Sequence, residues 1–289
     1  MSWRTVVISS RCKLDTKMGY LVIRGEETRR IFLDEISILL IENPAVSLTG
    51  CLLEALVERK VRVIFCDARR SPMAELAPYH GSHDSARKLR LQLGWDEFIK
   101  GAVWRAIVTE KISQQAALLA EQRKQREALL LESYLPQIEP QDTTNREGHA
   151  AKVYFNALFG LNFTRHTGGA INAALDYGYS LLLSAFNREI TACGYLTQLG
   201  LHHDNVFNHF NLSSDLMEPF RVLIDRRILS LEFSELDKSV RLALVSVLND
   251  EVMIRGSVQT VSNAIRIYVK GVFDALNERE LSHLTFYQI

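Results

Sequence analysis

Residues 199–225, LGLHHDNVFNHFNLSSDLMEPFRVLID, form a polar stretch between two segments with helical apolar spacing. It gathers His202, His203, Asp204, His209, Asp215 and Glu218 within a short span. Carboxylates bind hard divalent ions such as Mg²⁺ or Mn²⁺, and an added imidazole favours Mn²⁺ over Mg²⁺. The stretch holds no cysteine, which argues against a structural zinc site of the thiolate type. The pattern therefore predicts a loop that holds a divalent metal ion.

The same stretch has a second, purely structural interpretation. Asp215 followed three residues later by Glu218 has the spacing of a capping box at the start of a helix. Pro219 suits the first turn of that helix, where a missing N–H costs nothing. Spacing alone leaves both interpretations open.

A further carboxylate upstream presents the same choice. The sequence Thr144-Asn145-Arg146-Glu147 also matches a capping box, and the apolar pattern of a helix follows it. Glu147 is therefore either a helix cap or a side chain that a helix start projects into an active site.

Composition limits the classes of protein that this chain can belong to. With 289 residues, 47% of them hydrophobic, it is long enough for one large domain or two ordinary ones. We expect a cytoplasmic protein, since no apolar run reaches the length of a membrane span and the first residues resemble no secretory signal. The four cysteines form no C-x-x-C pair and are interpreted as small buried side chains in a reducing compartment.

The net charge of zero argues mildly against a generic nucleic-acid-binding protein, which usually carries a basic excess. The objection is weak, because acidic metal ligands cancel basic residues elsewhere in the chain. Binding of DNA depends on a local patch more than on the total charge.

The periodicity of apolar residues predicts an α+β protein. Up to residue 80, short β-branched runs alternate with turn-forming residues, and one helix is expected over 47–60 with Thr49 as its cap. From residue 86 the period changes to that of helices, over 95–135, 171–199 and 236–278. We therefore predict a β-rich N-terminal domain at 1–80, a linker at 81–88 and an all-helical domain at 89–289. The residues after 281 are expected to be frayed or bound to a partner.

Three motifs in a fixed order carry a resemblance to a known family. They are Gly200-Leu201-His202-His203, Asp215-Leu216-Met217-Glu218-Pro219-Phe220-Arg221, and Asn172-Ala173-Ala174-Leu175-Asp176-Tyr177-Gly178-Tyr179, with Glu147 upstream. This arrangement resembles the CRISPR-associated endonuclease/integrase of spacer acquisition, the Cas-one family. The segment Asn208-His209-Phe210-Asn211-Leu212 looks closest to type II systems.

The resemblance implies a catalytic centre in which Glu147, His203 and Glu218 hold one Mg²⁺ or Mn²⁺ ion. His203 occupies the fourth position of the Gly-x-x-His element, although His202 leaves an ambiguity of one residue. Asp215 and His202 are auxiliary candidates. Arg165, His166 and Arg221 are candidates for contacts with DNA phosphates, while Arg221 could instead pair with Asp225 at i and i+4. Tyr177 and Tyr179 either stack on bases or pack in the core.

The resemblance also implies a bacterial source, an activity and partners. In the family, the 3′-hydroxyl of a short double-stranded DNA fragment attacks a phosphodiester in the CRISPR repeat array, and with water as the nucleophile the same site is an endonuclease. The family acts as a homodimer in a larger complex with a small dimeric adaptor protein, and in type II systems with other CRISPR proteins. The N-terminal domain is assigned to dimerisation and docking.

Two other functions are compatible with the residues alone. One is a non-catalytic helical DNA-binding or assembly protein that keeps the two capping boxes and has no metal. The other is a metal-dependent hydrolase of small phosphoesters. Binding of Mn²⁺ separates the first from the integrase, and turnover without duplex DNA identifies the second.

Overall fold

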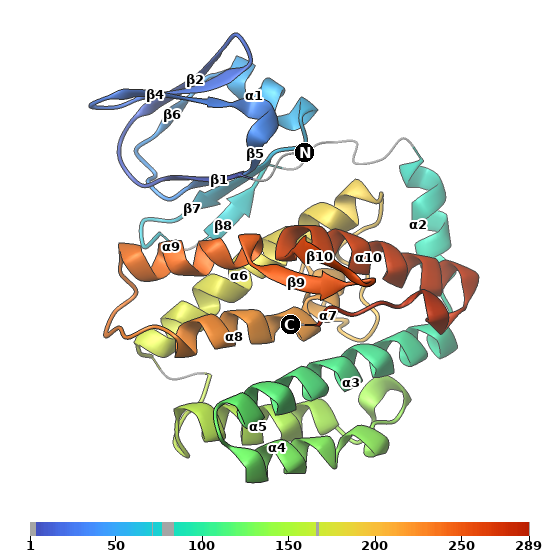
Figure 1. The fold of residues 1–289 in the computed structure, drawn as a ribbon. Coiled ribbons are helices and arrows are strands. Elements are labelled where there is room, and N and C mark those ends of the chain that lie inside the picture. The colour runs from blue at the N-terminus through green and yellow to red at the C-terminus, as the bar shows by residue number, and fades with distance from the viewer. Residues whose placement is uncertain (1–3, 71, 77–83, 166–167, 289) are drawn as a thin grey trace. The chain divides into compact units, whose positions relative to one another are not determined.

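The computed structural model describes residues 4–70, 72–76, 84–165 and 168–288, and divides the chain into two compact units, Met1–His80 and Gly81–Ile289 (Figure 1). The predicted α+β class is confirmed, because strands dominate the first unit and helices the second. Helix α2 (Ser85–Leu93) begins inside the segment predicted as a linker. The predicted His166 lies outside the described residues.

The first unit contains two four-stranded sheets. Its elements are β1 (Arg4–Ile8), β2 (Lys13–Lys17), β3 (Tyr20–Arg24), β4 (Thr28–Phe32), β5 (Ile36–Ile41), β6 (Ser47–Leu48), α1 (Gly50–Glu58), β7 (Arg62–Cys66) and β8 (Pro72–Glu75), with a 3₁₀ turn at Leu33–Glu35. One sheet has the order β1-β5-β7-β8, in which only β8 is antiparallel to its neighbour. The other has the order β4-β3-β2-β6.

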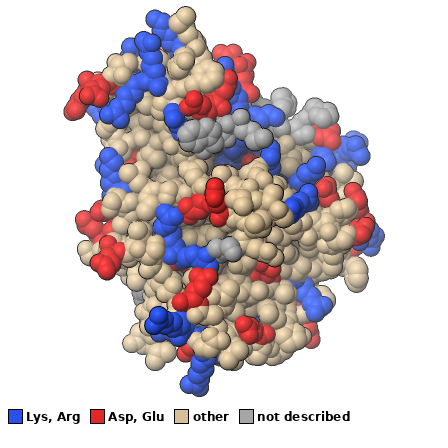
Figure 2. Space-filling model, viewed as in Figure 1, with Lys and Arg blue, Asp and Glu red and all other residues tan. Residues whose placement is uncertain are grey.

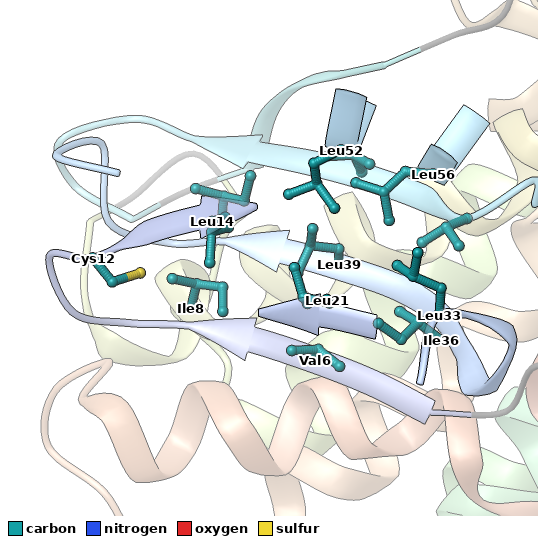
Figure 3. Close-up of a cluster of buried hydrophobic side chains, with 13 residues drawn as sticks. Val6, Ile8, Cys12, Leu14, Leu21, Leu33, Ile36, Leu39, Leu52 and Leu56 are labelled. Atoms are coloured by element: carbon teal, nitrogen blue, oxygen red, sulfur yellow. The ribbon is translucent and has the colours of Figure 1, made fainter. Parts of the chain in front are cut away.

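The core of this unit lies among both sheets and α1. The central strand β5 is buried along its whole length, as expected of a parallel strand with neighbours on both sides. Figure 3 shows Leu14 and Leu21 gathered with side chains of the other sheet and with Leu52 and Leu56 of α1. The predicted cap is confirmed, since Thr49 Oγ1 accepts a hydrogen bond from the N–H of Leu52.

The second unit is mainly a helical bundle. Its longer elements are α2, α3 (Glu97–Glu121), α4 (Gln125–Glu132), α5 (Arg146–Phe159), α6 (Ala170–Ala192), α7 (Asn211–Leu216), α8 (Arg221–Leu229), α9 (Lys238–Ser246) and α10 (Val261–Glu278). The 3₁₀ turns are Leu135–Gln137, Pro140–Asp142, Glu218–Phe220, Val247–Asn249 and Leu281–His283. The prediction of an all-helical domain is wrong in one place, where β9 (Glu251–Ile254) and β10 (Ser257–Thr260) form an antiparallel hairpin.

Helix α3 is the long element against which the helices of the site pack. Asp96 caps it by accepting a hydrogen bond from the N–H of Ile99, and α4, α5 and α10 contact it (Figure 1). Helices α6 and α8 approach each other closely. A Cβ added to Gly178 would lie 2.4 Å from Cγ2 of Ile224, so this crossing requires glycine.

The C-terminal segment is packed, so the prediction of a frayed tail is wrong. Tyr287 is fully buried, its ring lies 4.6 Å from the ring of Phe220, and its hydroxyl donates a hydrogen bond to the carbonyl of Pro219. Gln288 forms a β-bridge with Met253 of β9. The tail therefore supports the turn that follows α7.

The surface carries both signs of charge. Figure 2 shows acidic and basic side chains interspersed over the face in view, as the zero net charge suggests. Among the residues described, no helix is both long enough and apolar enough to cross a membrane. Cys12 and Cys66 are buried as expected, whereas Cys51 is exposed.

Candidate active site

A buried lysine joins the two carboxylates that the sequence motifs single out. Nζ of Lys111, on α3, lies 2.6 Å from Oε1 of Glu147 and 2.5 Å from Oε2 of Glu218. Lys111 and Glu218 are buried, and the side chain of Glu147 is 21% exposed. Two acidic residues far apart in the sequence therefore meet at one cation.

The capping-box interpretation of Glu147 is wrong. Asn145, in the left-handed region at φ 51°, caps α5 by accepting a hydrogen bond from the N–H of Gly148. The two carboxylate oxygens of Asp142 accept hydrogen bonds from the N–H groups of Arg146 and Glu147, each at 2.9 Å. Because these side chains satisfy the first turn, the carboxylate of Glu147 is available to Lys111.

The second capping box does not form either. Asp215 lies inside α7, which begins at Asn211, and Glu218 opens the 3₁₀ turn between α7 and α8. The carboxylate of Glu218 contacts Lys111 through Oε2, while Oε1 accepts a hydrogen bond from Nε of Arg221 at 2.9 Å. Both oxygens thus face cations instead of backbone amides.

Contacts between opposite charges set the pKa values of Glu218 and Lys111. Burial alone would raise the pKa of Glu218, but Arg221 and Lys111 outweigh it and lower that pKa to about 2. Burial alone would lower the pKa of Lys111, but Glu218 and then Glu147 outweigh it, so that pKa is raised. Glu218 and Lys111 are therefore both charged at neutral pH.

Asp215 organises the loop that carries the histidines. It is fully buried, and its oxygens accept hydrogen bonds from the N–H groups of Leu201, His202 and His203 at 2.6, 3.1 and 3.2 Å. A Cβ added to Gly200 would lie 2.3 Å from the carbonyl oxygen of His203 and 2.7 Å from Oδ2 of Asp215. The glycine of the Gly-x-x-His element is therefore required by close approach.

The structure distinguishes the two adjacent histidines. Nδ1 of His203 lies 2.5 Å from Oδ1 of Asp215, so a proton on Nδ1 is held by the carboxylate and the neutral ring presents a lone pair at Nε2. The hydrogen bond to Asp215 raises the pKa of His203 despite partial burial, and the charges of Glu218 and Glu147 add to this increase. The charges of Glu218 and Glu147 therefore both act on the imidazole of His203.

His202 has a different environment. Its ring stacks on buried Trp104 of α3, with centroids 4.6 Å apart and planes inclined by 5°. Its Nδ1 lies 3.3 Å from Oε1 of Gln141. His209 is exposed, and its backbone carbonyl accepts a hydrogen bond from Thr197. Of the three histidines in 199–225, His203 is the one tied to a carboxylate of α7.

The predicted phosphate-binding arginines have protein partners. Arg221 pairs with Glu218, whereas the predicted pair with Asp225 does not form; Asp225 accepts hydrogen bonds from the hydroxyls of Tyr154 and Tyr179. The guanidinium of Arg221 also lies 4.6 Å from the centroid of the Tyr179 ring.

Arg165 donates hydrogen bonds to Asn172 and Asp176 of α6. Tyr177 and Tyr179 are buried, which favours the packing interpretation of these tyrosines over base stacking.

The donor chemistry fits a divalent ion. Over the described ranges, the structure shows no group of three histidine, cysteine or acidic side chains already arranged around one point. Between the two carboxylates stands the ammonium of Lys111, which contacts both. Glu147, Glu218 and Nε2 of His203 nevertheless supply the oxygen and nitrogen ligands that Mn²⁺ or Mg²⁺ takes.

Sequence reasoning missed Lys111. It lies in a long helical pattern, and its neighbours Ile107, Val108 and Ile112 are all buried. A lysine three and four residues after buried apolar positions lies on the buried face of the helix. A buried lysine needs an acidic partner. A lysine on the apolar face of a predicted helix was therefore the sequence signal by which Lys111 could have been found.

Comparison with known proteins decides the family. The family model described as CRISPR associated protein Cas1 matches residues 5–236. The chain belongs to the Cas1 family. It is 33% identical over 284 residues to a protein of Neisseria meningitidis serogroup C (strain 8013) named CRISPR-associated endonuclease Cas1, covering 95% of this chain and 93% of that protein.

Solved structures share the fold of this Cas1-family chain. One, described as a casposase bound to integration product, superposes with a TM-score of 0.79 at 20% identity and covers 97% of this chain and 92% of that one. Another, from a Cas6-RT-Cas1--Cas2 complex, gives a TM-score of 0.75 at 17% identity over 97% of this chain. The match covers 36% of that longer chain. At these identities the likeness establishes the fold alone.

Proposed function

We propose that this protein is a divalent-metal-dependent DNA integrase and endonuclease that inserts short double-stranded DNA fragments into a CRISPR repeat array. The observation that carries the proposal is the meeting of Glu147 and Glu218 at one buried cation. The charges of both carboxylates raise the pKa of His203, whose Nδ1 is held by Asp215. Membership of the Cas1 family supports the substrate and the pathway.

In this proposal Glu147, Glu218 and Nε2 of His203 hold one Mn²⁺ or Mg²⁺ ion. Such an ion, when bound, polarises a phosphoryl oxygen and stabilises the negative charge that develops during phosphoryl transfer. The remaining chemistry belongs to the DNA. The 3′-oxygen of the incoming fragment forms a bond to a phosphorus of the repeat, and that phosphorus loses its bond to the neighbouring 3′-oxygen. The attacking hydroxyl gives its proton to solvent, and the departing 3′-oxygen takes up a proton and becomes a hydroxyl.

The other side chains of the cluster position the ligands. Asp215 keeps the proton of the neutral His203 ring on Nδ1, which leaves Nε2 free to bind a cation. Arg221 fixes one oxygen of Glu218 and leaves the other toward Lys111. Trp104 packs against both histidine rings and limits their rotation. These contacts hold the ligand side chains in place before an ion binds. Less conformational freedom is therefore lost on binding than in a flexible loop.

We also propose that the protein acts as a homodimer within a larger complex that contains a small dimeric adaptor protein. The shared fold with the chain of a Cas1--Cas2 complex supports this assembly. The segment 208–212 supports assignment to a type II system, in which other CRISPR proteins take part.

One competing function loses support, and another has a direct test. A non-catalytic DNA-binding or assembly protein would use Glu147 and Glu218 as helix caps, and neither side chain caps a helix. A hydrolase of small phosphoesters would turn over a model phosphodiester without duplex DNA, which gives a direct test of that alternative.

The proposal is tested by strand joining in the presence of Mn²⁺. Joining of a short duplex to repeat DNA should fall at least about 100-fold in Glu218→Gln and in His203→Ala, because each variant removes one ligand of the ion. His209→Ala and Glu232→Gln change exposed residues of the same types and should retain joining. Unchanged joining in Glu218→Gln would remove the mechanism.

A further inference from the structure

Lys111 is a buried cation that contacts the same two carboxylates that are proposed to bind the metal ion. Its ammonium contacts both Glu147 and Glu218 within 2.6 Å, and its side chain is 9% exposed. We propose that Lys111 is a built-in competitor of the divalent ion, holding the two carboxylates together and releasing at least one of them when the ion binds. This inference rests on the metal-dependent function proposed above.

The two carboxylate oxygens of Glu218 have different partners. Oε1 of Glu218 is already occupied by Nε of Arg221, so Oε2 is the oxygen that remains for another partner. That oxygen is buried and forms an ion pair with Nζ of Lys111 at 2.5 Å. A metal ion ligated by Glu218 therefore needs the oxygen that Lys111 now contacts.

The charged side chains around Lys111 balance one another. Glu147 and Glu218 bring two negative charges, and Lys111 and Arg221 bring two positive ones, so this group of four side chains is neutral. A divalent ion that entered without any movement would face an ammonium at contact distance in a poorly solvated site. Like charges at such a distance repel strongly when burial weakens the screening by water. Lys111 must therefore withdraw from at least one carboxylate.

Lys111 also has a role in the protein without added metal. Two carboxylates held near each other repel, and burial makes the repulsion costly. Lys111 removes that cost by bridging them, and its place on the buried face of α3 fixes the bridge between α5 and the turn after α7. The lysine thus stabilises the arrangement that the ion needs while lowering the affinity for the ion itself.

Because Lys111 has both roles, removing its charge should raise the affinity for Mn²⁺ and lower the melting temperature of the metal-free protein. Lys111→Met keeps an unbranched apolar stem but removes the ammonium. Its Mn²⁺ affinity, measured by calorimetry, should increase at least about tenfold, which corresponds to about 1.4 kcal/mol. Its melting temperature without added metal should fall, and saturating Mn²⁺ should raise that temperature by more than in the wild type.

Controls separate these effects from general damage. Lys100→Met removes a lysine of the same helix whose partner, Glu97, is largely exposed, and both measurements should stay near wild type. Lys111→Gln tests the same loss of charge with a polar side chain, should Lys111→Met fail to fold. Lys111→Arg keeps the charge and should bind Mn²⁺ no more tightly than the wild type.

The outcomes distinguish this inference from the proposed function. If the wild type binds Mn²⁺ in a manner that requires Glu218, but Lys111→Met and Lys111→Gln bind it equally or more weakly, the competition is refuted and the metal-dependent function remains. If none of these proteins binds Mn²⁺, the metal-dependent function is refuted together with the inference. Tighter binding in the neutral variants, lost again when Glu218→Gln is added, supports both.

Discussion

Replacing Asp215 by asparagine tests how the structure prepares His203. The carboxylate accepts four hydrogen bonds, two at each oxygen: from the N–H groups of Leu201 and His202 at Oδ2, and from the N–H and Nδ1 of His203 at Oδ1. In Asp215→Asn one of these oxygens becomes an NH₂ group, which donates instead of accepting. Whichever way the amide turns, two donors lose their acceptor.

The structure indicates which orientation costs less. An NH₂ group facing Leu201 and His202 would leave two backbone N–H groups without an acceptor. An NH₂ group facing His203 leaves only one, because the imidazole can move its proton to Nε2 and accept at Nδ1. We expect the second orientation, with a loss of stability of about 2–3 kcal/mol for the unpaired N–H and the lost charge-assisted bonds.

The same orientation removes a metal ligand. A proton on Nε2 blocks the lone pair with which His203 would bind the ion, so Mn²⁺ affinity should fall about 10- to 100-fold. Urea denaturation measures the first effect and calorimetry the second, with Asp204→Asn as a matched control at an exposed carboxylate of the same loop. A variant with full Mn²⁺ affinity and a stability loss below about 1 kcal/mol would refute this account of the loop.

Three further predictions follow from the same geometry. Gly200→Ala should destabilise the protein by about 1–3 kcal/mol in urea denaturation, because the added Cβ overlaps the carbonyl of His203; wild-type stability would contradict the close approach. The pKa of His203 is raised, so the stabilisation from its protonated pair with Asp215 is present below the ordinary imidazole pKa and is lost as the pH rises through the raised value. Mn²⁺ affinity should change in the opposite sense, falling as the pH drops through that raised pKa, and calorimetry between about pH 6 and 8 should show the fall at a higher pH in the wild type than in a protein with an ordinary histidine. Tyr287→Phe should cost about 1–2 kcal/mol in urea denaturation, since the buried carbonyl of Pro219 loses its donor, and a change below about 0.3 kcal/mol would show that the tail does not support the site.

The sequence predicted those elements of the first unit that are apolar. The predicted β-branched or apolar runs at 5–8, 20–23, 38–41 and 61–66 become β1, β3, β5 and β7. Strands β2 and β4 were missed, because KLDTK and TRRIF are mostly polar. Most residues of these two strands are at least partly exposed, so their pairing with β3, and not their own hydrophobicity, makes them strands.

The hairpin of the second unit was hidden by its surroundings. Strands β9 and β10 lie between two amphipathic helices, and their turn places Arg255 and Gly256 at positive φ. The glycine was the available turn signal, but four-residue strands are too short to interrupt a helical pattern. The tail after 281 was misjudged for a related reason, since its burial depends on contacts with Phe220 and Met253 that no local pattern reveals.

The candidate site shows the same division between local and distant information. Local spacing predicted helix starts near Glu147 and Glu218, and helices do begin there, but it assigned the wrong side chains to the caps. The meeting of these two residues depended on the family resemblance, because no periodicity connects segments so distant in the chain. Lys111 carried only the weak signal of a charge on an apolar face.

The most direct test of the central claim is to locate the ion. Crystals of the protein grown with Mn²⁺ should show one anomalous-scattering peak in contact with Glu147, Glu218 and Nε2 of His203, with Nζ of Lys111 withdrawn from at least one carboxylate. A protein active in Mn²⁺-dependent joining whose crystals show the peak elsewhere, with Lys111 still bridging both carboxylates, would contradict the claim that these residues form the metal centre.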